Sequence, residues 1–191
     1  NLLKILINYK IRLKKEFNRD KLILGFCASS AEIKCYHFLN LNDFIINLNK
    51  YSDKLFCFVL IGKFPVGNKF DLEKIKNNQN KYIMHIDENF QVNEDYIKSE
   101  IDFIYRSVND LSVSYSLYVS ASIGKPIISD DIGLLPHMLE EYKLGFTIPK
   151  NEFDFKCFSK NIQTWDSLYA DLFLKKRSWK VAANKIIQNC N

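Results

Sequence analysis

Short apolar runs alternate along the chain with segments in which apolar residues recur at helical spacing. The clearest run, Leu55–Ile61 (LFCFVLI), is apolar throughout, which is typical of a strand buried on both faces. Strands of this kind alternating with helices predict an α/β fold, a parallel sheet of about six strands with helices on both faces. The predicted strands are Leu22–Phe26, Leu55–Ile61, Tyr82–Ile86, Ile101–Tyr105, Pro126–Ser129 and Phe146–Ile148, and the predicted helices are Leu41–Leu48, Glu94–Ser99, Ser114–Ile123 and Leu134–Tyr142.

A basic amphipathic helix is predicted over residues 1–21, before the first strand, because apolar residues recur there at steps of three and four. This segment has seven basic and two acidic residues, a surplus equal to the net charge of the whole chain, +5. We expect its stripe to pack on the core or, as an interdomain segment, on a neighbouring domain; the alternative is contact with an anionic membrane. The stripe consists of Leu2, Leu6, Tyr9, Leu13 and Phe17.

Length and composition indicate one folded domain. The chain has 191 residues, 47% of them hydrophobic, so residues 22–150 are expected to form the α/β domain and residues 151–191 its helical tail. No apolar run reaches the length of a membrane span. Five dispersed cysteines and three scattered histidines indicate neither a disulfide framework nor a zinc cluster. We therefore expect a cytoplasmic protein, with peripheral contact at the inner face of the cell membrane as the alternative that the basic helix leaves open.

The first residue is Asn and no signal-peptide pattern follows it, so we expect the chain to be cut from a longer protein. Its six glycines have the wrong spacings for the GxGxxG and GxxxxGK[ST] motifs. The GxSxG and HExxH motifs are also missing. These observations disfavour dinucleotide-dependent dehydrogenases, P-loop enzymes and the common hydrolases.

One stretch, residues 101–149, contains a series of short motifs whose order resembles that of a known family. It reads IDFIYRSVNDLSVSYSLYVSASIGKPIISDDIGLLPHMLEEYKLGFTIP, with a GKP segment followed by SDDIGLLP and a final GFTIP. In order and spacing it resembles the C-terminal, nucleotide-sugar-binding domain of retaining glycosyltransferases of the GT-B type, the glycosyl transferases group 1 family. The resemblance implies two Rossmann-like domains in the whole enzyme, of which this chain is the donor-binding one.

The sequence departs from the common pattern of that family at two positions. The two glutamates that most members carry correspond to Leu111 and Val119. The chain is more similar to the branch that lacks this motif and has an S-G-S loop, where Ser114, Tyr115 and Ser116 stand, with Tyr115 in place of the glycine.

Hydroxyl groups near a helix N-terminus are suited to binding a diphosphate, because free N–H groups and a partial positive charge lie there. Ser112, Ser114 and Ser116 are candidates, together with Tyr115; a helix N-cap is the alternative role for Ser112 or Ser114. The resemblance adds Lys34 as a weaker diphosphate ligand, with a solvated surface lysine as the alternative. It also adds Ile86 and Phe90 as a shelf for the base; the alternative is that Ile86 belongs to the core and Phe90 to helix packing.

The function implied is the donor-binding half of a glycosyltransferase, which holds a nucleoside-diphosphate sugar for transfer to a saccharide or lipid-linked acceptor in polysaccharide biosynthesis. No metal or other cofactor is expected, because helix amides and hydroxyls can stabilise the leaving diphosphate. Without an N-terminal acceptor domain the chain is expected to be inactive, and its catalytic residues are unknown. The rival interpretation is an inactive, glycosyltransferase-like partner or acceptor-binding subunit. A nucleic-acid partner is not expected, since the positive charge is concentrated in one terminal helix.

Overall fold

A computed structural model describes residues 2–17, 22–28, 38–61, 82–86, 98–106, 115–148 and 154–177 of the chain. The described residues form a six-stranded sheet in which every pair of neighbouring strands is parallel. The strands are β1 (Leu22–Ala28), β2 (Leu55–Ile61), β3 (Ile83–Ile86), β4 (Phe103–Tyr105), β5 (Ile127–Asp130) and β6 (Gly145–Ile148). Their order across the sheet is β3-β2-β1-β4-β5-β6, so the chain moves outward from β1 first in one direction and then in the other.

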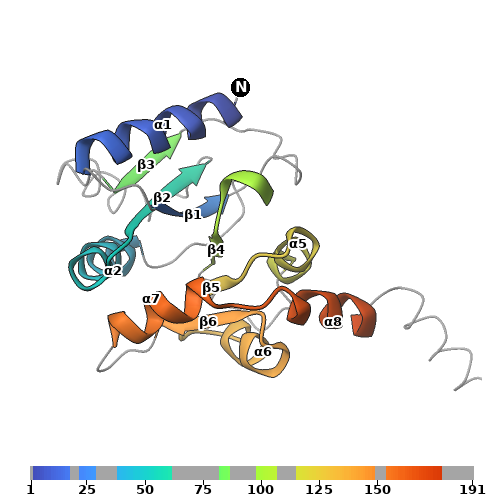
Figure 1. Ribbon diagram of the computed structural model, residues 1–191. Helices are drawn as coiled ribbons and strands as arrows, with labels where there is room; N and C mark the ends of the chain where they lie inside the picture. The colour runs from blue at the N-terminus through green and yellow to red at the C-terminus, as the bar shows by residue number, and fades with distance from the viewer. Residues whose placement is uncertain are drawn as a thin grey trace, which may run out of the picture.

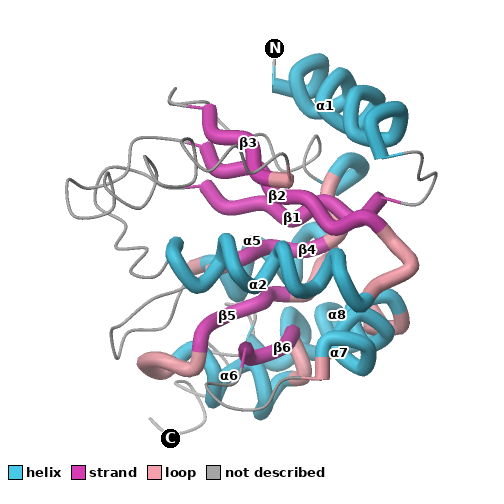
Figure 2. The backbone as a smooth tube through the Cα atoms, turned by 90° about the vertical axis from the view of Figure 1, so that its left-hand side faces the viewer, coloured by secondary structure: helices cyan, strands magenta, loops and turns pink. Residues whose placement is uncertain are grey.

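Helices cover both faces of this sheet, as the sequence predicted (Figure 1). The helices are α1 (Leu2–Phe17), α2 (Phe38–Tyr51), α5 (Ser116–Ile123), α6 (Leu135–Tyr142), α7 (Phe155–Gln163) and α8 (Leu168–Arg177). Helices α2 and α7 lie in front of the sheet in Figure 2 and share one hydrophobic core with it. Helices α1, α5, α6 and α8 share the core on the opposite face.

Strand β2 shows why a strand in this position is apolar at every residue. All seven of its side chains are buried, and alternate residues enter different cores. Leu55, Cys57, Val59 and Ile61 pack beneath α1, whereas Phe56, Phe58 and Leu60 pack beneath α2 and α7.

The core beneath α2 and α7 is rich in aromatic rings, which leave room only for glycine at position 25 of β1. The Phe58 ring meets those of Phe103 and Tyr105 edge to face, with centroids 5.4 and 5.5 Å apart. A Cβ atom on Gly25 would lie 2.4 Å from the Phe103 ring and 2.6 Å from the Phe58 ring. A side chain at position 25 would therefore displace this aromatic cluster.

Helix α1 packs its predicted stripe on the sheet. Leu6, Tyr9 and Leu13 are at most 3% exposed, and Phe17 stacks on Tyr82 with ring centroids 4.9 Å apart. This confirms the expected contact with protein. The membrane alternative, in which the same stripe would face lipid, is wrong for these three residues because their side chains lie in the core.

Most predicted elements have different ends from the observed ones, although the pattern of elements is confirmed. Helix α2 extends beyond the predicted Leu41–Leu48 in both directions. Its C-terminal turn is held by Asn49, whose side-chain amide donates to the Phe56 carbonyl at 2.7 Å and whose Oδ1 accepts from the Phe56 N–H at 2.7 Å. A contact between a helix and the following strand thus stabilises residues beyond the apolar stripe. The predicted tail contains α7 and α8, and residues 178–191 lie outside the described part of the chain.

Candidate functional site

The order in which the chain adds strands to the sheet reverses between the two central strands, β1 and β4. β1 and β4 are hydrogen-bonded neighbours, and the chain leaves them toward opposite ends of the sheet. In open parallel sheets, ligands bind outside the carboxyl ends of the strands at such a switch point, because the connecting loops separate there. Strand order alone therefore directs attention to the ends of β1 and β4.

The carboxyl ends of β4 and β5 carry a cluster of buried polar side chains. The Tyr105 hydroxyl donates a 2.8 Å hydrogen bond to Oδ2 of Asp130, and the two side chains are 1% and 6% exposed. Arg106 follows Tyr105 directly; its backbone N–H donates to the Ile128 carbonyl at 2.8 Å, and the residue is only 9% exposed. Arg106 therefore brings a positive charge to the edge where the switch-point rule places a ligand.

Helix α5 begins after the loop that follows β4. Tyr115 precedes its first residue in helical geometry (φ −57°, ψ −25°), and its carbonyl accepts from the N–H groups of Tyr118 and Val119. No side chain caps this helix start in the described residues. Tyr115 is 73% exposed, and Ser116 is half-buried. The opposite end of α5 is closed by Gly124 at φ +64°, a conformation that favours glycine.

The predicted site residues are only partly within the described structure. Tyr115 and Ser116 lie at the start of α5, and Ile86 is the last residue of β3, half-buried and packed against the core beneath α1. The other four predicted residues lie outside the described ranges: Lys34, Phe90, Ser112 and Ser114. Their part in the site stays a prediction.

Sequence reasoning missed Arg106, Tyr105 and Asp130 as members of this edge. One signal was available for Arg106: it is a charged residue between the apolar run of β4 and the polar loop that leads to α5. The pairing of Tyr105 with Asp130 had no such signal, because the two residues are 25 positions apart.

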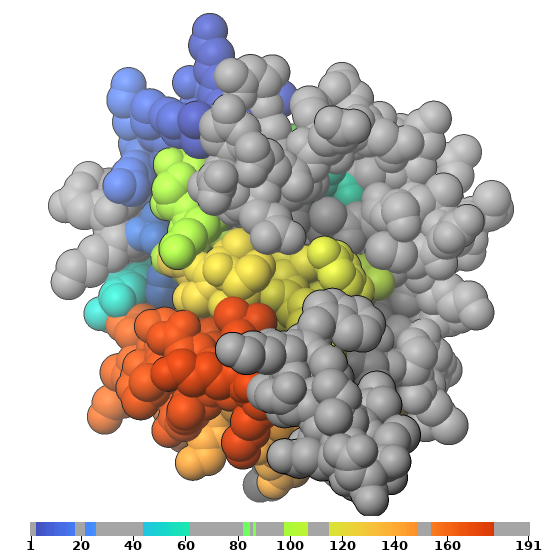
Figure 3. All heavy atoms as spheres, turned by 90° about the vertical axis from the view of Figure 1, so that its right-hand side faces the viewer, coloured from blue at the N-terminus to red at the C-terminus, as the bar shows by residue number. Residues whose placement is uncertain are grey.

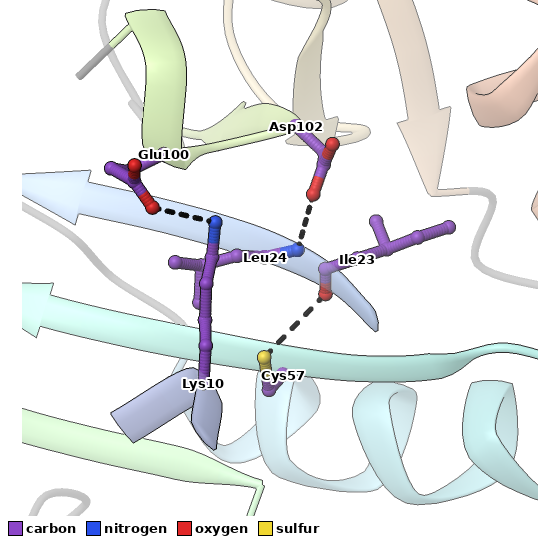
Figure 4. A network of polar contacts seen from close by, with 6 residues as sticks. All are labelled: Lys10, Ile23, Leu24, Cys57, Glu100 and Asp102. Atoms are coloured by element: carbon purple, nitrogen blue, oxygen red, sulfur yellow. Dashed lines mark hydrogen bonds and ion pairs between the residues drawn. The ribbon is translucent and has the colours of Figure 1, made fainter. Parts of the chain in front are cut away.

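The amino ends of the strands form a different environment, shown in Figure 4. Asp102 Oδ2 accepts a 2.7 Å hydrogen bond from the buried N–H of Leu24, and Asp102 N–H donates to the Leu24 carbonyl. The Lys10 ammonium of α1 pairs with Glu100 at 3.0 Å, which ties α1 to the segment before β4. The Asp102 side chain therefore links the backbone of β1 to the start of β4, at the edge opposite the switch-point site.

A hollow of about 470 Å³ opens at this amino edge. Lys14, Lys54 and Lys125 line it together with Asp102 and Trp165, and the Trp165 indole N–H donates to the Lys143 carbonyl at 2.9 Å. Helices α1, α5 and α7 end beside it, so carbonyl groups and negative helix-dipole ends point toward it. The lysines offset those dipoles.

Two ionisable groups with raised pKa values lie in the core beneath α1. Burial raises the pKa of the Tyr9 phenol and of the Cys57 thiol well above their usual values. Cys57 is therefore protonated and inert at neutral pH. Within the described ranges, no group of three or more His, Cys, Asp and Glu residues could hold a metal ion. No helix in the same ranges is long and apolar enough to cross a membrane.

Comparison with known proteins identifies the fold. No protein-family model and no curated protein matches the sequence. Among solved structures, HepE of Anabaena in complex with UDP and glucose superposes with a TM-score of 0.60 at 13% identity, over 94% of this chain and 50% of HepE. WaaG, a glycosyltransferase involved in lipopolysaccharide biosynthesis, gives a TM-score of 0.57 at 10% identity, over 90% of this chain and 48% of WaaG.

A third structure contains a single domain. It is the C-terminal domain of the glycosyl transferase group 1 family protein LpcC from Francisella tularensis, with a TM-score of 0.58 at 13% identity, over 85% of this chain and 89% of that domain. This chain has the fold of that C-terminal domain. It spans about half the length of HepE and WaaG. The predicted Rossmann-like, GT-B-type fold is thereby confirmed.

Proposed function

We propose that this chain is the donor-binding half of a glycosyltransferase and that it holds a nucleoside-diphosphate sugar at the carboxyl edge of its sheet. One observation carries the proposal: the strand order β3-β2-β1-β4-β5-β6 places its switch point between β1 and β4, directly before the loop that leads into α5. HepE, which shares this fold, has been crystallised with UDP and with UDP-glucose.

Electrostatics favours this edge over the amino edge for a diphosphate. The N–H groups at the start of α5 carry a partial positive charge of about +0.5, and Arg106 adds a full positive charge at the end of β4. Ser112, Ser114 and Ser116 supply hydroxyl donors in this proposal, and Lys34 a second cation. Ile86 and Phe90 flank the base. The leaving diphosphate is stabilised by these groups without a bound metal.

The orientation of Tyr115 supports a binding domain over the inactive alternative. A tyrosine folded over the start of α5 would cover the N–H groups that a diphosphate needs. Tyr115 is instead 73% exposed, and its backbone adopts the helical geometry that a glycine at this position would also allow. An exposed ring is what we expect of a tyrosine that does not cover the start of the helix.

Sugar transfer itself requires more than this chain in our proposal. The acceptor, a saccharide or a lipid-linked saccharide, would bind an N-terminal domain, so we expect the 191-residue protein to show no transfer above background hydrolysis. Cys57 and Cys157 are both free thiols, which fits a reducing compartment and a cytoplasmic role in polysaccharide biosynthesis.

Calorimetric titration with uridine and guanosine diphosphates tests the proposed site. We expect selective binding of one of them by the wild-type protein. Ser114→Asp should weaken that binding by at least roughly tenfold, because a fixed negative charge would oppose the phosphates. Ser122→Asp is the matched control, since Ser122 is exposed near the far end of α5, on the order of 10 Å from its start.

Equal affinity in wild type and Ser114→Asp would remove the proposed site. Absence of binding by the wild-type protein, with a normal melting transition, would favour the inactive partner. Equal losses in Ser114→Asp and Ser122→Asp would point to a general charge effect and contradict the assignment to the start of α5.

A further inference from the structure

Helix α1 has a second apolar feature that its contact with the core does not use. Ile7 and Ile11 are 38% and 48% exposed and stand one helical turn apart on the side of α1 that faces away from the sheet. Lys4, Lys14 and Lys15 are exposed on the same side. The outer face of α1, defined by these five residues, is a pair of isoleucines flanked by lysines.

This outer face differs from the stripe recognised in the sequence. Leu6, Tyr9 and Leu13 are buried in the core and are not available to any partner. Lys10 is also occupied, since it pairs with Glu100. The surplus of positive charge in α1 therefore lies where the helix meets solvent.

Helix α8 provides an internal comparison. Leu168 and Leu172 are 53% and 44% exposed and have the same spacing as the isoleucine pair of α1. Asp166 and Asp171 are exposed beside them, although three basic residues follow in the last turn. The apolar pair of α8 thus has acidic as well as basic neighbours, since Lys175 and Lys176 follow Leu172 by one turn, whereas that of α1 has lysines one turn away on either side.

We propose that the outer face of α1 docks on an anionic lipid bilayer. A basic helix surface with a few large aliphatic side chains suits the interface of such a bilayer, where the lysines meet lipid phosphates and the isoleucines enter the headgroup region. A second copy of this chain is a poor occupant, because it would bring an equally positive face. Each lysine close to an anionic surface contributes roughly fivefold to partitioning, so the three together contribute on the order of 100-fold.

Docking through α1 leaves the candidate donor site open. Helix α1 runs antiparallel to the strands, since its last turn reaches Lys14 beside the first residues of β1. The carboxyl edge of the sheet then faces along the membrane and not into it. In Figure 3, α1 (blue) lies at the upper left, and α5 (yellow) separates it from α8 (orange-red).

Flotation of the full 191-residue chain with lipid vesicles tests this proposal. Vesicles of phosphatidylcholine mixed with phosphatidylglycerol are compared with vesicles of phosphatidylcholine alone. We expect binding to the mixed vesicles only, and its loss in about 1 M NaCl, where the screening length is about 3 Å. The double variant Ile7→Ser/Ile11→Ser and the triple variant Lys4→Gln/Lys14→Gln/Lys15→Gln should each reduce binding by at least roughly tenfold.

The matched control is Leu168→Ser/Leu172→Ser on α8, which should bind the mixed vesicles as the wild type does. All substituted side chains are exposed, so circular dichroism and melting should show folded proteins. Equal binding to both kinds of vesicle, no binding to either, or equal losses in the α1 and α8 variants would overturn the proposal. Nucleotide titration of the isoleucine variant is an independent readout, so failure here is distinguishable from failure of the donor site.

Discussion

The two edges of the sheet face opposite ends of the helix dipoles although the same strands and helices form both. At the carboxyl edge, β4 is followed by Arg106, and α5 presents its N-terminus after the next loop. At the amino edge, helices present their C-termini and three lysines lie beside Asp102. Because helices that link parallel strands run antiparallel to them, helix dipoles always favour anions at one edge and cations at the other.

This comparison shows that the number of lysines alone does not describe the electrostatics of an edge in this protein. The amino edge has three lysines around its hollow, yet their charge is offset by carbonyl ends and by Asp102. At the carboxyl edge, Arg106 and the backbone N–H groups at the start of α5 stand against the charge of Asp130. Substitutions at the two edges should therefore separate stability from nucleotide binding.

The largest expected effect is on stability and arises at the amino edge. Asp102→Ala leaves the buried Leu24 N–H without its carboxylate acceptor, and we expect it to lower the free energy of unfolding by about 3 kcal/mol, measured by urea denaturation. Nucleotide affinity should stay unchanged under conditions where the variant is folded. Asp102→Asn keeps an acceptor oxygen and should lose less; equal losses in both variants would show that the hydrogen bond is not the cause.

The next largest effect is on nucleotide affinity and compares a cation at the carboxyl edge with one at the amino edge. Arg106→Met should weaken nucleoside-diphosphate binding about 10- to 100-fold, because a charged hydrogen-bond donor is lost at the carboxyl edge. Lys125→Met removes a cation from the amino edge and should leave affinity within about twofold. Similar titration curves for the two variants would contradict the difference between the edges.

A smaller effect on stability is expected at the carboxyl edge. Tyr105→Phe removes the hydroxyl that donates to buried Asp130, at a cost of about 2 kcal/mol in thermal or urea unfolding. Affinity for the nucleotide should fall as well, since the Asp130 carboxylate loses the hydroxyl donor that partly offsets its negative charge near the phosphates. Tyr51→Phe is the control, because Tyr51 is 54% exposed, and it should change neither quantity.

The smallest effect tests the core that lies between the edges. Since burial raises the pKa of Tyr9, the unfolded chain loses this proton above about pH 10 while the folded protein keeps it, so stability falls as the pH rises. Cys57 adds to the fall from a lower pH, because its pKa is also raised. Tyr9→Phe should reduce the loss of stability at about pH 11 by roughly 1 kcal/mol. Parallel pH profiles for wild type and variant would refute this origin.

Much of the fold was predictable because local pattern and burial coincide in it. Strand β2 was predicted with its observed ends. The predicted stripe of α1 includes the three residues that are buried, Leu6, Tyr9 and Leu13. The ends of α2 were not predicted, because the Asn49–Phe56 contact that extends the helix is specific to the folded chain. For the candidate site, the motifs of residues 101–149 indicated the loop after β4 and the start of α5, and this assignment stays a prediction. The roles predicted for Ser112 and Ser114 stay predictions.

By itself, the amino-acid sequence determined the order of helices and strands along the chain, the burial of β2 on both faces and the position of polar residues after β4. These features depend on neighbours within a few positions, where periodicity and composition act directly. Only the tertiary structure decided the strand order, the burial of Arg106 and the pairing of Tyr105 with Asp130. It also decided which apolar residues of α1 stay outside the core. These properties arise from contacts between residues far apart in the chain, whose geometry exists only after the sheet has formed.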